Sequence, residues 1–316
     1  MRPIGGEIEV KDTKESIFFS DSGRSSLRLF IRNIDKKKVY LIPNYFCKAI
    51  ESTLIDEGVS YKFYNVLEDL SIDKFSVNRS NYDILYIINY FGKIQNLVGI
   101  NIGDKILLED NVFLYDFTNT RGVKNWFSFN SFRKITELAD GSLIKTTLDI
   151  DPLAIEPNCS KYSSIKYMAK NNKNNYINHG KGAESDYLDL FKLGENELNN
   201  QRDIYSISDK SCYYLSIHDV YKNQIDRKSN FESFYDVFWD ICVNSQPEYY
   251  SFFTFKVENN NYVVEKLAKK GIYLPIHWIK STQENALYGK LISIPCFGPY
   301  NHREINYVIN SIRGVI

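Results

Sequence analysis

Residues 39–66 decide the fold, and they read VYLIPNYFCKAIESTLIDEGVSYKFYNV. The run 39–43 is almost wholly apolar and predicts a buried strand, whereas residues 47–57 place apolar side chains at helical spacing and precede Gly58. Residues 61–66 then predict a second strand. A strand, a helix and a strand in this order form a βαβ unit, which places two parallel strands in one sheet.

Further apolar runs extend this sheet. Residues 83–89, 105–109 and 142–145 are apolar enough to be strands that are covered on both faces. The sequence therefore predicts an α/β fold with a mostly parallel sheet and helices on both faces. In such folds, ligands bind at the loops that follow the carboxyl ends of the strands.

The chain is predicted to form two domains. Residues 1–240 would be the large α/β domain, in which 170–175 (KNNKNN) form a polar surface loop and 185–238 form helices. Residues 241–316 would be a smaller α+β domain. Its predicted elements are one strand and two helices, near 250–257, 263–270 and 303–312.

The composition excludes several classes of protein. The 316 residues include 39 Lys and Arg against 39 Asp and Glu, so no global positive charge favours binding to nucleic acid or to an anionic membrane. Residues 1–10 lack the apolar stretch of a secretion signal, and 84–91 is too short to span a bilayer. The five cysteines and four histidines lack the spacing of a metal site, which predicts reduced thiols, a cytoplasmic location and no bound metal.

Two segments near predicted element ends carry residues that are suited to phosphate or ring binding. In 18–30, Ser22 and Gly23 precede a helical pattern, and a helix N-terminus offers backbone amides to a phosphate. Residues 106–110 end a predicted strand with the carboxylate of Asp110, at the edge where ligands bind. An ordinary helix cap and a solvated strand end would explain the same residues, so both interpretations stay open.

Two later segments hold a lysine and a histidine. Residues 128–141 contain Ser131 and Lys134 among aromatic side chains, where loss of solvation would lower the pKa of the lysine and make it a nucleophile. A solvated Arg-Lys pair is the structural alternative. His277 and Trp278 are placed side by side and could line a pocket.

The order of these segments resembles a family of pyridoxal-phosphate-dependent sugar aminotransferases of fold type I, often called DegT/DnrJ/EryC1/StrS. FSDSGRSSL at 19–27 is similar to the family's opening S-G-[TR]-x-[AS]-L element, and 39–66 is similar to its strand, turn, helix and strand. The other similar stretches are ILYIINYFG (84–92), LLED (107–110), SFNSFRKITELADGSLI (128–144), GIYLPIHW (271–278) and SIPCFGPYNHREINYVINSI (293–312). The resemblance covers most of the chain.

The resemblance implies a pyridoxal 5′-phosphate cofactor and a role for each matching residue. Lys134 would bond to the cofactor aldehyde and later move protons at the substrate carbon. Asp110 would keep the pyridine nitrogen protonated, so that the ring withdraws electrons. The cofactor phosphate would be held by Ser22, Gly23, Arg24 and Ser131.

The chain departs from the family pattern at two positions near this site. Cys47 stands where many relatives carry an aromatic residue that stacks on the cofactor ring, which leaves Tyr45 or Phe46 as the expected stacking partner. Phe113 stands three residues after Asp110, where Gln or His is common. The departures concern the substrate pocket more than the cofactor site.

The leading interpretation is a cytoplasmic transaminase that moves an amino group to a nucleotide-linked keto sugar, with glutamate as the expected donor, in surface polysaccharide or amino-sugar biosynthesis. His277 and Trp278 would contact that substrate, and the resemblance implies a homodimer whose sites are completed by the partner chain. Two alternatives stay open. One is a related dehydratase, in which His replaces the residue at Lys134; the other is a catalytically degenerate chain that binds a sugar nucleotide or a partner without transamination.

Overall fold

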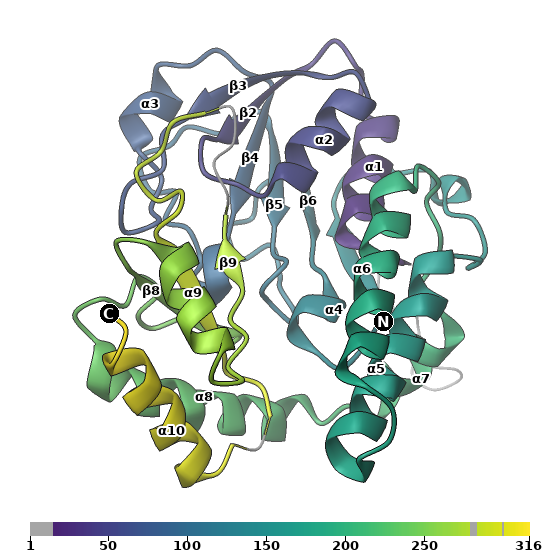
Figure 1. The fold of residues 1–316 in the computed structure, drawn as a ribbon. Coiled ribbons are helices and arrows are strands. Elements are labelled where there is room, and N and C mark those ends of the chain that lie inside the picture. The colour runs from purple at the N-terminus through teal and green to yellow at the C-terminus, as the bar shows by residue number, and fades with distance from the viewer. Residues whose placement is uncertain (1–14, 279–282, 299) are drawn as a thin grey trace, which may run out of the picture.

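The computed structural model of the protein describes residues 15–278, 283–298 and 300–316, and it shows a main sheet with a smaller sheet beside it (Figure 1). The expectation about residues 1–10 lies outside these residues. In spatial order, the strands of the main sheet are β1 (Ser16–Ser20), β7 (Ser142–Thr146), β6 (Trp126–Phe129), β5 (Ile106–Asp110), β4 (Ile84–Ile88), β2 (Val39–Pro43) and β3 (Ser60–Tyr64). Among these strands, β7 alone has a direction opposite to that of the other six, so the predicted mostly parallel sheet is confirmed.

The central strands and their first helices follow from the apolar pattern. All five residues of β4 and all five of β5 are buried, as expected for strands in the middle of a covered parallel sheet. Helix α1 (Gly23–Asn33) packs on β1, β6 and β7 through buried side chains such as Leu27 and Phe30. Helix α2 (Lys48–Asp56) lies beside α1 and ends just before Gly58, whose φ of 69° suits the turn into β3.

The carboxyl ends of six strands meet at one edge of the main sheet. Strands β2, β3, β4, β5 and β6 are parallel, and β1 has the same direction because two antiparallel pairings through β7 separate it from β6. The loops that follow these strands therefore lie together. This edge is where an open α/β sheet places its ligands.

One prediction is wrong: residues 170–175 are helical rather than a loop. They lie within α5 (Lys161–His179), which pairs with α6 (Glu184–Asn200) as an extended hairpin at the side of the sheet (Figure 1). The N-terminal half of α5 is anchored by buried Tyr162 and Ala169. No proline or glycine interrupts the polar half before Gly180, so this half stays helical although it is largely exposed to solvent.

The remaining elements of the large part are mostly short connections. They are α3 (Lys74–Asn78), η1 (Tyr90–Gly92), α4 (Phe132–Ile135), η2 (Pro152–Ala154), α7 (Asp209–Ile217) and the long α8 (Val220–Phe238). The helical character expected over 185–238 is confirmed. None of the helices among the described residues is both long enough and apolar enough to span a membrane.

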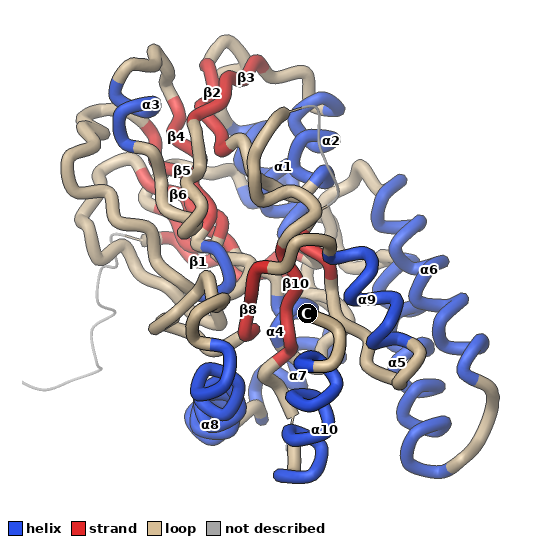
Figure 2. Tube along the Cα trace, turned by 60° about the vertical axis from the view of Figure 1, so that its left-hand side comes forward, coloured by secondary structure: helices blue, strands red, loops and turns tan. Residues whose placement is uncertain are grey.

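The smaller sheet is antiparallel and has its own core. Its strands are ordered β8 (Phe252–Lys256), β10 (Leu291–Pro295) and β9 (Ile276–His277), and helices α9 (Asn260–Ala268) and α10 (His302–Arg313) lie near it (Figure 2). Apolar side chains of α8 also join this core; they are Phe231, Phe234 and Phe238. The predicted division at residue 240 stays a prediction, and a boundary before α8 would fit this packing better.

Candidate active site

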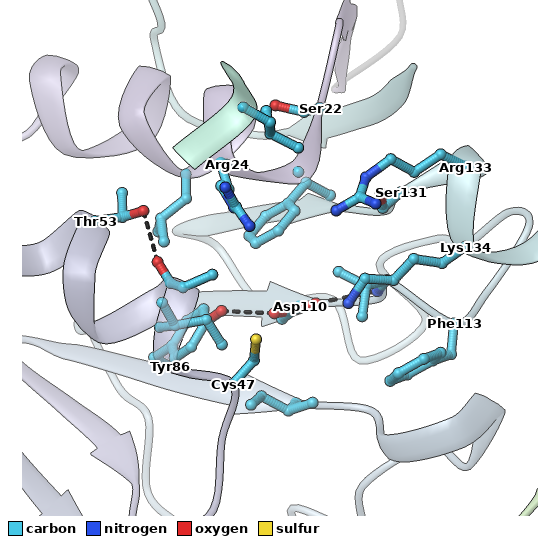
Figure 3. A pocket seen from close by; sticks show the side chains of 18 of the residues that line it. Ser22, Arg24, Cys47, Thr53, Tyr86, Asp110, Phe113, Ser131, Arg133 and Lys134 are labelled. Atoms are coloured by element: carbon cyan, nitrogen blue, oxygen red, sulfur yellow. Dashed lines mark hydrogen bonds between the residues drawn. The ribbon is translucent and has the colours of Figure 1, made fainter. Parts of the chain in front are cut away.

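A cavity opens at the carboxyl edge of the main sheet. It holds about 670 Å³ of space that protein atoms do not fill, part of it open to solvent. Its walls come from the residues that follow β1, β2, β5 and β6, from the end of β4, from α2 and α6, and from Trp278 (Figure 3). The cavity therefore lies where the topology of the sheet predicts a ligand site.

The N-terminus of α1 forms one wall. Ser22 is the N-cap residue, and its Oγ accepts a hydrogen bond from the backbone N–H of Ser25 at 3.2 Å. A Cβ on Gly23 would lie 3.2 Å from the carbonyl oxygen of Asn130, so a larger residue would force α1 away from the loop after β6. The first amides of a helix have no carbonyl partner within the helix, so this wall offers donors to an anion.

Asp110 is a buried carboxylate at the end of β5. Its Oδ2 accepts a hydrogen bond from the Tyr86 hydroxyl at 2.6 Å, and its Oδ1 accepts one from the backbone N–H of Val112 at 3.0 Å. Burial raises the pKa of Asp110, whereas the Tyr86 bond, the charge of Lys134 and the Val112 bond lower it in part. The carboxylate is thus fixed in orientation and still has acceptor sites left for a donor in the cavity.

Lys134 extends from α4 toward Asp110 (Figure 3). Burial lowers the pKa of Lys134, and the positive charges of Arg133 and Arg24 lower it further. Cys47 and Asp110 act in the opposite direction. Within the described residues, no hydrogen bond or ion pair holds the Nζ of Lys134. The result is an amine with an increased neutral fraction, which is the form that attacks a carbonyl carbon.

The short helix that carries Lys134 is anchored at both ends. The backbone N–H of Phe132 donates to the carbonyl of Gly141 at 2.9 Å, and the Thr136 hydroxyl donates back to the carbonyl of Phe132 at 2.7 Å. On its far side, the guanidinium of Arg227 donates to the carbonyl of Ile135. Because Ile135 directly follows Lys134, these bonds fix the base of the lysine side chain.

The predicted phosphate-binding residues lie in this same cavity. Ser22 and Ser131 are buried and line it, together with Gly23 and Arg24. Ser131 is the N-cap residue of α4, three positions before Lys134. The structure therefore brings together Ser22, Gly23, Arg24, Asp110, Ser131 and Lys134, as the resemblance implied.

Two predicted residues lie behind the cavity wall. Tyr45 is fully buried and is not among the lining residues; its hydroxyl donates to the carbonyl of His277 at 2.5 Å, and its ring lies 5.0 Å from that of Trp278. The ring of His277 packs on Phe91 at 4.7 Å and is also outside the lining. Burial lowers the pKa of His277 to about 3, and the charge of Lys134 adds to that effect, so the ring is neutral. Of the aromatic pair 277–278, only Trp278 reaches the cavity.

The lining also includes Tyr86, Phe113 and Arg133, to which the sequence assigned no role. Tyr86 lies in β4 and fixes Asp110, and the apolar run around it gave no sign of this contact. Phe113 is buried, and the centre of its ring lies 5.3 Å from the Nζ of Lys134. Arg133 precedes Lys134 and could have been found only from its place in the same motif. No group of three potential metal ligands occurs among the described residues, as far as His, Cys, Asp and Glu are concerned.

Comparison with solved structures identifies the fold. The Spr1654 protein of Streptococcus pneumoniae in its PMP-form, described as a sugar aminotransferase, superposes with a TM-score of 0.64 at 14% identity over 95% of this chain and 87% of that one. A DegT DnrJ EryC1 StrS aminotransferase from Brucella abortus gives 0.55 at 14% identity, over 94% and 85%.

The fold also occurs in aminotransferases that are not described as sugar aminotransferases. The histidinol-phosphate aminotransferase of Clostridium acetobutylicum gives a TM-score of 0.54 at 13% identity, over 96% of this chain and 84% of that one. No protein-family model and no curated protein matches the chain. The resemblance noted from the sequence is thus confirmed at the level of architecture: the chain has the fold of fold type I aminotransferases.

Proposed function

We propose that the protein is a pyridoxal-phosphate-dependent sugar aminotransferase that uses glutamate to aminate a nucleotide-linked keto sugar. The single observation that carries the proposal is that Lys134 and Asp110, distant from each other in sequence, face one cavity at the carboxyl edge of the sheet (Figure 3). A primary amine of lowered pKa and a fixed carboxylate are the two groups that this cofactor requires from a protein.

The residues present fit the cofactor in three respects. Gly23 and Arg24, in the first turn of α1, line the cavity beside Ser22 and Ser131, and the first amides of a helix have no carbonyl partner within the helix, so they can bind a phosphate. The carboxylate of Asp110 can accept a further hydrogen bond from a protonated ring nitrogen. The Nζ of Lys134 has no hydrogen-bond or ion-pair partner among the described residues and is therefore available to an aldehyde.

Four side chains of the cavity would have separate roles in the proposed transamination. When bound, pyridoxal phosphate supplies an electron-withdrawing ring that stabilises negative charge on the carbon beside the amino group. Asp110 would hold the proton on the ring nitrogen, and Tyr86 would keep the carboxylate in place. Lys134 would take a proton from the substrate carbon and return it, since its lowered pKa increases the fraction of the amine that is neutral and able to act as a base. Trp278 would cover the substrate side of the cavity and limit the entry of water.

One observation favours the alternative of a degenerate chain. The ring of Phe113 lies against the Nζ of Lys134, where a polar side chain is common in the family that the chain resembles. A chain of this kind would bind a sugar nucleotide or a partner through the same cavity without forming a bond to the cofactor. The homodimer, the cytoplasmic location and the role in surface polysaccharide or amino-sugar biosynthesis stay predictions.

The test is the absorbance spectrum of the purified protein with pyridoxal phosphate. We expect a visible band from the lysine-bound cofactor that disappears when glutamate is added. Lys134→Ala should lose this band and reduce turnover at least about 10³-fold, because it removes the amine, while its melting temperature stays close to that of the native chain. Lys256→Ala is the matched control, since Lys256 pairs with Glu68 at 2.6 Å outside the cavity. A native protein that never acquires the band would refute the enzymatic proposal in favour of the degenerate chain.

A further inference from the structure

Three cations surround one carboxylate on the side of the cavity where α6 lies. The Oε1 of Glu195 accepts a hydrogen bond from the Nη1 of Arg133 at 2.9 Å and another from the Nζ of Lys166 at 2.8 Å. Its Oε2 lies 3.8 Å from the Nη2 of Arg24. We refer to Arg24, Arg133, Lys166 and Glu195 as the Glu195 cluster.

The Glu195 cluster has more positive than negative charge. Burial alone would raise the pKa of Glu195, but Arg133, Lys166 and Arg24 outweigh it and lower that pKa to about 2. The carboxylate is therefore ionised at neutral pH. Three cations and one anion leave a net charge of about +2, which one further dianion would neutralise.

Only part of the Glu195 cluster faces the cavity. Arg24 and Arg133 line it, whereas Glu195 and Lys166 are not among the lining residues. Figure 3 shows the two guanidinium groups turned toward each other. The Nε of Arg133 is buried and has no hydrogen-bond partner among the described residues. Two like charges that face each other, with a donor left over, form a site that favours an anion between them.

Glu195 also has a second partner away from the arginines. The Nζ of Lys166 donates both to Glu195 and to the carbonyl of Phe191 at 3.1 Å. A Cβ on Gly194 would lie 3.0 Å from the Lys166 side chain, so the glycine leaves room for this lysine to lie along α6. The carboxylate can therefore give up the two guanidinium groups and still keep an ion pair with Lys166.

We propose that Arg24 and Arg133 bind a phosphate dianion in the cavity, and that the carboxylate of Glu195 competes with it for both guanidinium groups. Guanidinium groups match phosphate oxygens in geometry as well as in charge. With the dianion bound by the arginines and Glu195 held by Lys166, every charge in the Glu195 cluster has a partner. The identity of the phosphate rests on the proposed function: it belongs either to the cofactor or to the diphosphate of a nucleotide sugar.

Titration with inorganic phosphate tests the site itself. The full chain is dialysed against hydroxylamine to remove any bound aldehyde and is then titrated with phosphate by calorimetry. Arg133→Gln should weaken phosphate binding about tenfold, because it removes a charge-assisted hydrogen bond. Glu195→Gln should tighten it about threefold or more, because it removes the competing carboxylate. Arg24→Gln repeats the first test should Arg133→Gln fail to fold, and melting curves establish which variants are folded.

Matched controls keep the charge change and leave the cavity intact. Arg202→Gln removes a guanidinium that pairs with Asp56 at 3.1 Å, and Glu265→Gln removes an exposed carboxylate that pairs with Lys269 at 2.8 Å. Both should leave the phosphate affinity unchanged. The proposal would be overturned if the native chain, Arg133→Gln and Glu195→Gln bound phosphate with equal affinity. It would also be overturned if Glu195→Gln bound phosphate more weakly than the native chain.

Two further titrations identify the source of the phosphate. If Arg133→Gln lowers the affinity for pyridoxal phosphate and not that for phosphate-free pyridoxal, the site serves the cofactor. If it lowers the affinity for uridine diphosphate and not that for uridine, the site serves the substrate. Either result supports the site. A chain that binds phosphate as expected but never bonds to pyridoxal phosphate would refute the proposed function alone.

Discussion

The two faces of β5 carry neighbouring carboxylates with different surroundings. On one face, the Oε2 of Glu109 accepts a hydrogen bond from the indole N–H of Trp126 at 2.6 Å, and its Oε1 pairs with Arg121. On the other face, Asp110 has a neutral hydroxyl and a backbone amide as hydrogen-bond donors and borders the cavity. Both side chains are almost completely buried. The charge of Glu109 is neutralised by Arg121 within the fold. The carboxylate of Asp110 is only oriented by its two neutral donors, so it can interact with a charged group of a ligand.

The comparison shows that burial and residue type do not by themselves assign a function. Alternate residues of a strand point to opposite faces of the sheet, so Glu109 and Asp110 cannot share surroundings. A carboxylate that is ion-paired within the fold stabilises the fold. One that is held only by neutral donors, next to a cavity, is available for chemistry.

The largest expected effect comes from removing the charge that faces the cavity. Asp110→Asn should lower turnover by about 10²- to 10³-fold, since an amide cannot keep a ring nitrogen protonated. The same substitution, Asp110→Asn, should not lower the stability of the fold. The pKa of Asp110 in the fold lies above its ordinary value of 3.8, so the ionised carboxylate destabilises the fold as the pH rises through that pKa. At pH 7, the variant should melt no lower than the native chain, and a clearly lower melting temperature would contradict this assignment.

The matching change on the other face should act on stability. Glu109→Gln removes the charge that neutralises Arg121 and should destabilise the fold by about 2 kcal/mol, which chemical denaturation can measure. The expected loss in the free energy of unfolding is moderate because the side chain of Arg121 is 23% exposed and can be hydrated. Turnover per folded molecule should stay near the native value. Loss of turnover without loss of stability would show that the two faces are not separate in function.

The smallest expected effect comes from the hydroxyl that orients Asp110. Tyr86→Phe removes the hydrogen bond to Oδ2 and should lower turnover several-fold, by about tenfold at most. Because that bond lowers the pKa of Asp110, its loss should raise the pKa further. The acid limb of the pH-rate profile should therefore move to higher pH in the variant. A shift to lower pH would contradict the role given to Tyr86.

Sequence reasoning was most reliable where the signal is local. The strand at 39–43, the helix before Gly58, and the motifs around Ser22, Asp110 and Lys134 each lie within a short stretch, and topology then brings them to one edge. The helix over 170–175 was missed because its polar half has no apolar face to reveal a period. Here the absence of helix-breaking residues was the better guide.

The contacts that could not be predicted join residues that are far apart in the chain. Glu195 meets Arg24 and Arg133 only because α6 returns to the cavity, and nothing near Glu195 in the sequence indicates this. Tyr45 or Phe46 was expected to stack on the cofactor, because each is aromatic and lies near the motif. Both are fully buried outside the cavity lining: the hydroxyl of Tyr45 donates to the carbonyl of His277, and the ring of Phe46 packs on that of Phe63. The direction of one side chain in a loop is set by tertiary packing rather than by the local sequence.

The reversed direction of β7 has a consequence for how the protein is made. Because β7 pairs with β6 as an antiparallel neighbour, the turn that carries Lys134 is the connection of a hairpin, closed locally by the bond between Phe132 and Gly141. Short connections close with little loss of chain entropy, and N-terminal segments leave the ribosome first. The turn that carries the amine can thus form during synthesis before α6 has emerged to add Leu198 to the wall, and before Arg227 of α8 has emerged to bond to the carbonyl of Ile135. A nascent chain that has not yet completed its cavity could already present its reactive group.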